Sequence, residues 1–241
     1  MKTINYILVT AIVLSFSSCM QQPKEKEITE TTSQQAYEYM TTARLTVSES
    51  KRLIAKGISA NKEVKDRLEN GIVIITLGTT NTYLAEELAG LSTPRGSFVT
   101  GRIFPSSKED FAKGMKRLSE IVLMKGKPVD ISYADALSRM NAKDIVFKGA
   151  NMVNYAKRQA AVCVGAPDGG TVAKLRKYTD RGKGRWIVPV GLEKETTQDL
   201  FEMQKLTNGD TPRGKGTVRL NVTQGNIYTE IEALKEFADV D

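Results

Sequence analysis

The stretch that decides the fold is residues 144–194, DIVFKGANMVNYAKRQAAVCVGAPDGGTVAKLRKYTDRGKGRWIVPVGLEK. Residues 144–147, 160–164 and 186–190 are short apolar runs rich in Ile and Val, each bounded by Gly or Pro. Such runs are typical of strands buried on both faces, as in a parallel sheet. We therefore expect the three runs to lie in one mostly parallel sheet of an α/β fold.

A helix is expected over residues 171–179, between the second and third runs. Residues 167–170 lead into it and Gly182 follows it, so the stretch reads as a strand–helix–strand unit. A Gly-Gly pair lets the backbone approach a bound group, and the free N–H groups of a first helical turn attract an anion. The residues predicted to bind a phosphate or carboxylate here are Gly169, Gly170 and Thr171.

The first 18 residues have the pattern of an export signal. A basic residue is followed by an apolar run at residues 7–14, which is short of the roughly 20 residues that span a bilayer. Residues 16–19, Phe-Ser-Ser-Cys, resemble the lipobox of bacterial lipoproteins, in which the Cys becomes the lipidated first residue. We expect lipidation of Cys19 and anchoring to a membrane of the cell envelope; the alternatives are an ordinary thiol beside a cleaved signal, or a short amphipathic anchor.

The rest of the chain divides into a tether and one domain. Residues 19–41 are polar and charged, so they are expected to form a flexible tether. Residues 42–241 have the length of a single α/β domain.

The charge balance favours an anionic partner. The chain has 35 basic and 28 acidic residues, or +7, and removal of the signal leaves 34 against 28, or +6. Nucleic acid, an anionic membrane and a phosphorylated ligand all fit this balance. The export signal and an aromatic content of only 7% count against nucleic acid. No cofactor and no metal site are predicted.

The second cysteine, Cys163, lies in the apolar run 160–164, and the chain contains no His to serve as its base. We expect a packing thiol rather than a nucleophile. No internal disulfide is possible if Cys19 is acylated.

Residues 71–89 form a second informative stretch. An apolar strand at residues 72–77 is followed by a hydroxyl-rich turn and a helix that is expected to begin at Thr82. Such a turn forms an anion cradle, although a residue that merely caps the helix is the alternative. The Gly-Lys-Ser/Thr ending of a P-loop is absent. The residues predicted to bind the anion are Gly78, Thr79, Thr80 and Asn81.

The sequence Gly-Thr-Thr-Asn-Thr at residues 78–82 resembles the phosphate loop of ribose-5-phosphate isomerase A and its glucosamine-6-phosphate deaminase and CoA-transferase relatives. Residues 144–153, 168–171 and 190–194 are similar, in the same order, to later segments of that isomerase. This resemblance, over roughly residues 71–194, implies the three-layer, Rossmann-like fold of that superfamily, with a ligand at the carboxyl ends of the strands.

The chemistry of that family transfers poorly to this chain. Aldose–ketose isomerisation there resembles proton transfer by carboxylates, yet the matching positions hold Lys148 and Asn151. Three roles are open for Lys148: a base or Schiff-base nucleophile, a contact for an anionic ligand, and a solvated residue that closes a strand. Asp168 and Glu193 are the other catalytic candidates, while Asn151 and Lys194 are predicted ligand contacts.

Three functions are compatible with these patterns. The first is a lipid-anchored envelope protein that binds a small phosphorylated or carboxylated metabolite. The second is an isomerase or acyl/CoA-transferase-like enzyme of the same superfamily. The third is a structural envelope lipoprotein without a working site. The oligomeric state is not indicated by the sequence.

The remaining segments are expected to form scaffold. Helices are predicted at residues 46–57, 61–68, 106–122, 132–140, 197–206 and 229–237, and strands at 98–104 and 217–222. Six basic residues within positions 174–185 are expected to form a solvated face, with attraction of an anionic partner or of lipid headgroups as the alternative.

Overall fold

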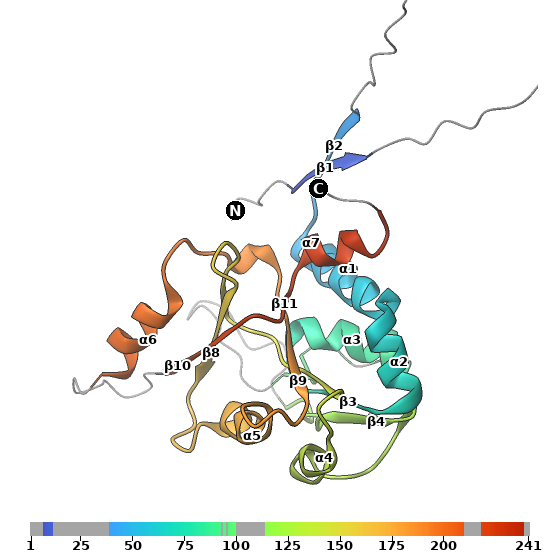
Figure 1. Cartoon of the computed structure of the whole chain (residues 1–241), viewed down its shortest axis with the longest axis vertical. Helices are drawn as coiled ribbons and strands as arrows, with labels where there is room; N and C mark the ends of the chain where they lie inside the picture. Colours follow the sequence, from blue (N-terminus) through green and yellow to red (C-terminus); the bar gives the residue numbers. More distant parts are fainter. Residues whose placement is uncertain are drawn as a thin grey trace, which may run out of the picture.

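The computed structural model of the chain describes residues 7–11, 39–92, 94, 96–99, 114–209 and 218–238. Its largest sheet has six strands, which run across the sheet in the order β11 (Ile227–Tyr228), β9 (Arg185–Pro189), β6 (Ile145–Phe147), β3 (Ile72–Ile75), β4 (Ile121–Met124) and β5 (Lys127–Pro128). The first four are parallel to one another, and β4 and β5 are added in antiparallel pairings. The predicted α/β class with a mostly parallel sheet is therefore confirmed (Figure 1).

One of the three expected parallel strands lies in a different sheet. β8 (Gln159–Val164) pairs antiparallel with β7 (Met152–Asn154) and β10 (Arg219–Gln224). A four-residue turn, in which Arg158 has a left-handed φ of 52°, connects β7 to β8 as a hairpin. The prediction of a strand–helix–strand unit within one sheet was thus wrong.

The reason for this error lies in the surroundings of β8. Val162 packs into the core cluster shared with the main sheet, while Ala161 packs on the opposite face against Leu200 and Val222. A strand covered on both faces has an unbroken apolar sequence whether its neighbours run parallel or antiparallel. The sequence of β8 therefore carries no information about the direction of its partners.

Helices cover one face of the main sheet. They are α1 (Val47–Ala60), α2 (Lys62–Asn70), α3 (Thr79–Ala89) and α7 (Glu230–Lys235). Ile54 of α1 and Leu84 of α3 are fully buried with Phe147 of β6. At Gly57 of α1, an added Cβ would lie only 2.5 Å from Cα of Ala233, so glycine is what allows α7 to pack this closely on α1.

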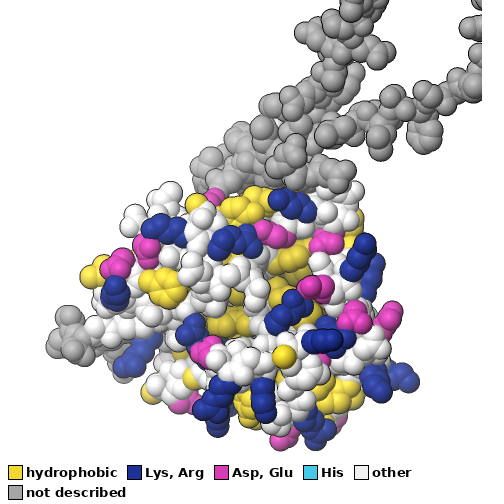
Figure 2. All heavy atoms as spheres, in the orientation of Figure 1, with side chains coloured by type: hydrophobic (Ala, Val, Ile, Leu, Met, Phe, Trp, Pro, Cys, Tyr) yellow, Lys and Arg dark blue, Asp and Glu magenta, His cyan; other side chains and the backbone are white. Residues whose placement is uncertain are grey.

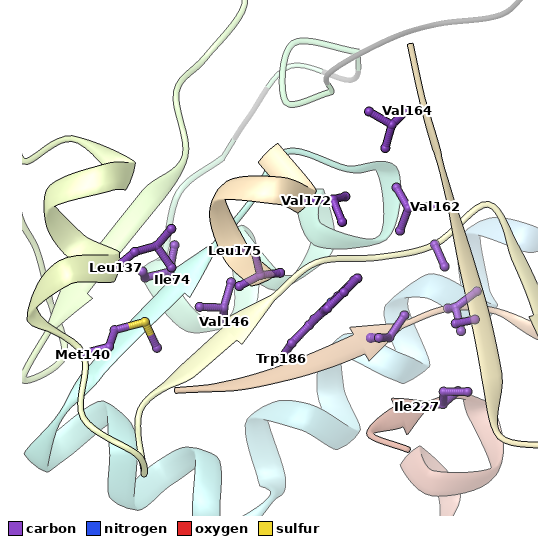
Figure 3. Close-up of a cluster of buried hydrophobic side chains, with 14 of the residues drawn as sticks. Ile74, Leu137, Met140, Val146, Val162, Val164, Val172, Leu175, Trp186 and Ile227 are labelled. Atoms are coloured by element: carbon purple, nitrogen blue, oxygen red, sulfur yellow. The ribbon is translucent and has the colours of Figure 1, made fainter. Parts of the chain in front are cut away.

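The opposite face is covered by α4 (Tyr133–Arg139), α5 (Gly170–Thr179) and the small sheet. Figure 3 shows Trp186 and Val146 of the main sheet beside Leu175 of α5 and Val162 of β8. α6 (Leu200–Asn208) packs on β10 and β8 at the outer side of the small sheet (Figure 1).

Capping signals predicted several helix starts correctly. Thr46 with Glu49, and Thr229 with Glu232, form the expected capping boxes, and Ser132 caps α4. α6 starts later than expected, because Asp199 is its N-cap. In the final helix, Ala233 is buried, while Phe237, two residues after the end of this helix, is 56% exposed.

The predicted helix over residues 106–122 was wrong in its last part. Met115 and Leu118 lie in a non-helical segment and Val122 lies in β4, while residues 106–113 are outside the described residues. Residues 121–124, Ile-Val-Leu-Met, form a strand. Its first apolar residues continue the helical spacing of the apolar residues before it, so the predicted helix was extended into the strand. Phe98 and Val99, expected to begin a strand, belong to no strand, and residues 100–104 are not described.

Near the amino terminus, β1 (Ile7–Ala11) pairs antiparallel with β2 (Tyr39–Ala43). β1 lies within the predicted signal, and β2 overlaps the end of the predicted tether. The other residues before position 39, including Cys19, lie outside the described residues. None of the helices that the structure describes combines the length and the apolar character needed to cross a bilayer.

Candidate functional site

The carboxyl ends of β3, β6 and β9 lie next to one another. The N–H of Thr76, after β3, donates to the carbonyl of Phe147 at 3.0 Å, and the N–H of Lys148 donates to the carbonyl of Ile187 at 3.1 Å. Segments that were predicted to share a site, around Gly78, Lys148 and residues 190–194, therefore start from one edge of the sheet. This is the edge at which open α/β sheets bind ligands.

α3 begins at Thr79, three residues earlier than expected, so the predicted turn is its first turn. Its N-cap is Gly78, and no side chain caps the helix. The alternative that a Thr or Asn merely caps this helix is thus not what the structure shows. Among described residues, the N–H groups of Thr79, Thr80 and Asn81 have no acceptor, and the first amide bonded within the helix is Thr82 N–H to Gly78 O at 2.9 Å.

Asn81 joins this helix to the sheet. Its side chain is fully buried, and Nδ2 donates to the carbonyls of Thr76 at 2.8 Å and Phe147 at 3.0 Å. Oδ1 is also buried and has no hydrogen-bond partner within the described chain. Thr79, by contrast, is exposed and Thr80 is buried. Within the described part of the chain, the first turn of α3 thus contains three amides without an acceptor and one buried side-chain oxygen without a donor.

Lys148 is a buried lysine at the end of β6, with only 7% of its surface exposed. Its backbone is held on both sides, because its N–H donates to Ile187 and its carbonyl accepts from the Trp186 indole Nε1 at 2.8 Å. Burial lowers the pKa of its ammonium to about 8, and the Glu120 carboxylate partly opposes this shift. No hydrogen bond or ion pair to the ammonium is found among the described residues.

Glu120 and Tyr133 belong to the same neighbourhood, and sequence reasoning missed both. Burial, reinforced by Glu120, raises the pKa of the Tyr133 phenol. That phenol donates to the carbonyl of Thr171 in the first turn of α5, at 3.4 Å. The charge of Glu120 therefore acts on both Lys148 and Tyr133, and Tyr133 in turn contacts the start of α5. Nothing in the sequence marks Glu120, which directly precedes β4, or Tyr133, which follows a helix cap.

The glycine loop before α5 is ordered by Asp168. Its Oδ1 accepts the N–H of Gly170 at 2.9 Å, and Gly169 is the N-cap with a left-handed φ of 80°. Asp168 is exposed. Asp168 therefore has a structural role at the start of α5. Of the predicted ligand residues in this loop, Thr171 is the one that contacts Tyr133.

Lys194 and Glu193 lie in a short 3-10 helix, η1 (Leu192–Lys194). Lys194 Nζ donates to the carbonyl of Ala150 at 2.8 Å, and burial lowers the pKa of its ammonium. Glu193 is exposed. Lys194 is therefore bonded to the segment that follows Lys148, and one of its three ammonium donors is used in this way.

A buried carboxylate that sequence reasoning missed lies beside this helix. Glu230 is 3% exposed and accepts from the Leu192 N–H at 3.0 Å and from the hydroxyl of Ser50. Burial raises the pKa of Glu230. The group connects α1, α7 and η1. In the sequence, Glu230 is marked only by its position directly after the helix cap Thr229, and acidic residues are common there in scaffold helices.

Asn151 has a structural contact in place of a free side chain. Its Oδ1 accepts the N–H of Cys163 at 2.9 Å, and its own N–H donates to Ala161 at 2.8 Å. Asn151 thus ties the residue directly before β7 to β8. Cys163 is half-buried and burial raises the pKa of its thiol, which agrees with a packing role.

The basic residues near α5 separate into two groups. Arg176 donates to the carbonyl of Val222 and Arg185 pairs with Glu63 at 2.8 Å, so both contribute to the scaffold. The exposed members are Lys174, Lys177, Arg181 and Lys183. In Figure 2, Lys and Arg side chains gather along the lower side of the molecule, over α5.

A shallow depression of about 480 Å³ lies at the opposite, amino-terminal edge of the sheet. Its charged lining mixes both signs and comprises Lys62, Glu63, Asp66, Arg67, Lys143 and Arg185. No predicted site residue contributes to it. In the described chain, no group of three or more Cys, Asp or Glu side chains is placed to hold a metal ion.

Comparisons with models of protein families, with curated proteins and with solved structures gave no match.

Proposed function

We propose that this chain is a lipid-anchored envelope protein whose three-layer, Rossmann-like domain binds a small phosphorylated or carboxylated metabolite at the carboxyl edge of the main sheet. Cys19 is the anchor in this proposal. The observation that carries it is Lys148, whose buried ammonium has no hydrogen bond or ion pair within the described residues.

Burying an ammonium without a partner is costly, so buried charges in proteins are normally paired. The Glu120 carboxylate acts on this ammonium but forms no ion pair with it among the described residues. A bound anion would supply such a pair. The first turn of α3 would add the amides of residues 79–81, and Tyr133, which contacts Thr171 at the start of α5, is influenced by the same Glu120 charge as Lys148. These three features favour a ligand with one compact negative group.

Enzymatic proton transfer by carboxylates has less support. Asp168 orders the start of α5, and Glu193 is exposed, so neither is held at the Lys148 ammonium. Binding is therefore the proposed primary role.

The test is a thermal-shift panel on the full chain with phosphate, sugar phosphates, short carboxylates and CoA, and with uncharged sugars as controls. Binding to the folded state alone stabilises it by about 2.7 kcal/mol at roughly 100 times Kd. We expect at least one anion to raise Tm. Lys148→Met should reduce affinity by about tenfold to a hundredfold, as expected for loss of a charged hydrogen bond.

Lys177→Met, on the exposed side of α5, is the matched control and should bind as the wild type does. The proposal fails if no anion raises Tm. It also fails if Lys148→Met responds to the anion as strongly as the unchanged chain.

A further inference from the structure

We propose that Lys148 captures its ligand as a reversible imine, so that the metabolite is a carbonyl-bearing anion such as a 2-oxo acid or a phosphorylated aldehyde or ketone. The inference rests on the proposed function, because it names the class of anion that binds at the carboxyl edge of the sheet. It adds a covalent step that a simple anion site does not need.

The first argument is geometric. Lys148 is held at its N–H by Ile187 and at its carbonyl by the Trp186 indole, so the base of the side chain is fixed. Its amine is buried and, among described residues, not engaged by any acceptor. Lys194 shows the contrast, because its buried amine is bonded to the carbonyl of Ala150 at 2.8 Å. Of these two lysines, Lys148 is the one whose nitrogen is available to react.

The second argument concerns protonation. A lysine must lose its proton before it attacks a carbonyl carbon, and burial lowers the pKa of Lys148 to about 8. At about pH 7.5, this makes its unprotonated fraction roughly two hundred times that of a lysine with an ordinary pKa. Desolvated lysines are the usual Schiff-base nucleophiles for this reason.

The step needs acid–base groups, and the charge of Glu120 acts on both Lys148 and Tyr133. The Lys148 amine adds to the carbonyl carbon and forms a C–N bond, and the nitrogen loses a proton while the carbonyl oxygen gains one. The resulting hydroxyl takes a second proton and leaves as water, which gives a protonated imine. Glu120, whose charge acts on Lys148, is the group proposed to move these protons. Tyr133 remains protonated, because its pKa is raised, and its hydroxyl donates to the carbonyl of Thr171.

The experiment is reductive trapping. The full chain is incubated with sodium cyanoborohydride and either pyruvate or glyceraldehyde 3-phosphate, and the products are analysed by intact mass and peptide mapping. Lactate and glycerol 3-phosphate are matched anions without the reactive carbonyl. Hydride converts the imine to a secondary amine, so the chain should gain the mass of the carbonyl compound minus one oxygen.

We expect the adduct on Lys148 with at least one carbonyl compound, with labelling that rises from about pH 7, is half-maximal near the pKa of about 8 and levels off about one pH unit above it. Lys148→Arg, which keeps the charge, should abolish it, and Lys177→Arg should not. Wild-type peptide mapping remains decisive if Lys148→Arg does not fold.

The outcomes separate the two proposals. If a carbonyl compound and its matched alcohol raise Tm equally and neither labels Lys148, the imine is excluded and the anion site stands. If labelling is spread evenly over exposed lysines, the imine proposal is likewise overturned. If none of these anions binds or labels the chain, and the wider panel of phosphates, carboxylates and CoA also fails, both proposals fail.

Discussion

The Asn81 side-chain amide donates to the carbonyl of Phe147 at 3.0 Å and so holds the end of β6 one residue before Lys148. Residues 66 positions apart are thereby linked at the carboxyl edge of the sheet. The link connects the first turn of α3 with the lysine on which both proposals rest.

Asn81→Ala tests this link. The change removes both donors from Asn81 Nδ2 and leaves the Thr76 carbonyl without that partner, so we expect a loss of about 1–3 kcal/mol in the free energy of unfolding. Urea denaturation measures it. Thr79→Ala, at the exposed first position of the same helix, should change stability much less; equal losses would contradict a specific role for Asn81.

Gly57→Ala tests the contact between α1 and α7. Alanine favours a helix over glycine by about 1 kcal/mol, but its Cβ would lie 2.5 Å from the Cα of Ala233. Because that atom belongs to the backbone, α7 must shift, and we expect net destabilisation of about 1–3 kcal/mol by thermal or urea unfolding. Lys56→Ala on exposed α1 surface is the control. A more stable Gly57→Ala protein would disprove the close contact.

Glu230 is expected to make stability depend on pH. Its pKa in the folded protein is raised above the ordinary 4.5, so the folded state prefers the protonated form. This contribution is present at low pH and is lost as pH rises from about 4.5 through the folded pKa. The stability of the wild type relative to Glu230→Gln should therefore decrease over that range.

Chemical denaturation at several pH values measures this difference. Glu69→Gln, at an exposed position of α2, is the control and should show no such trend. A wild type that gains stability over Glu230→Gln as pH rises would reverse the assigned direction.

Cys19→Ala should release the protein from the membrane. If Cys19 carries a lipid, the substitution removes the anchor, and the protein should move from the membrane fraction to the soluble fraction and lose labelling by a fatty-acid probe. Cys163→Ala is the matched control and should remain labelled and membrane-bound. Unchanged fractionation of Cys19→Ala would contradict lipid anchoring.

Local signals in the sequence predicted much of this fold. Capping boxes at Thr46 and Thr229 gave correct helix starts, because such a box satisfies amides within four residues. Apolar runs located β3, β6 and β9. The strands that pair with β8 could not be predicted. A strand buried on both faces has the same continuous apolar sequence in a parallel sheet and in an antiparallel sheet.

The candidate site was predictable only in part. Lys148 was identified because it directly follows a buried strand, and Asn81 because it lies in a hydroxyl-rich turn. Glu120 and Tyr133 come from other segments of the chain, and the charge of Glu120 acts on Lys148 and Tyr133 only after folding, so no spacing in the sequence connects them. Asp168 and Asn151 were selected for their chemistry, but their contacts with backbone amides are local and structural.

The two outer strands of the main sheet, β11 and β5, are each two residues long. β5 consists of Lys127 and Pro128, and a proline has no N–H with which to extend a ladder. Short borders that carry a charge or a proline discourage another chain from adding a strand. For a protein proposed to be anchored on a membrane, these borders consequently disfavour fibrous self-association through the main sheet.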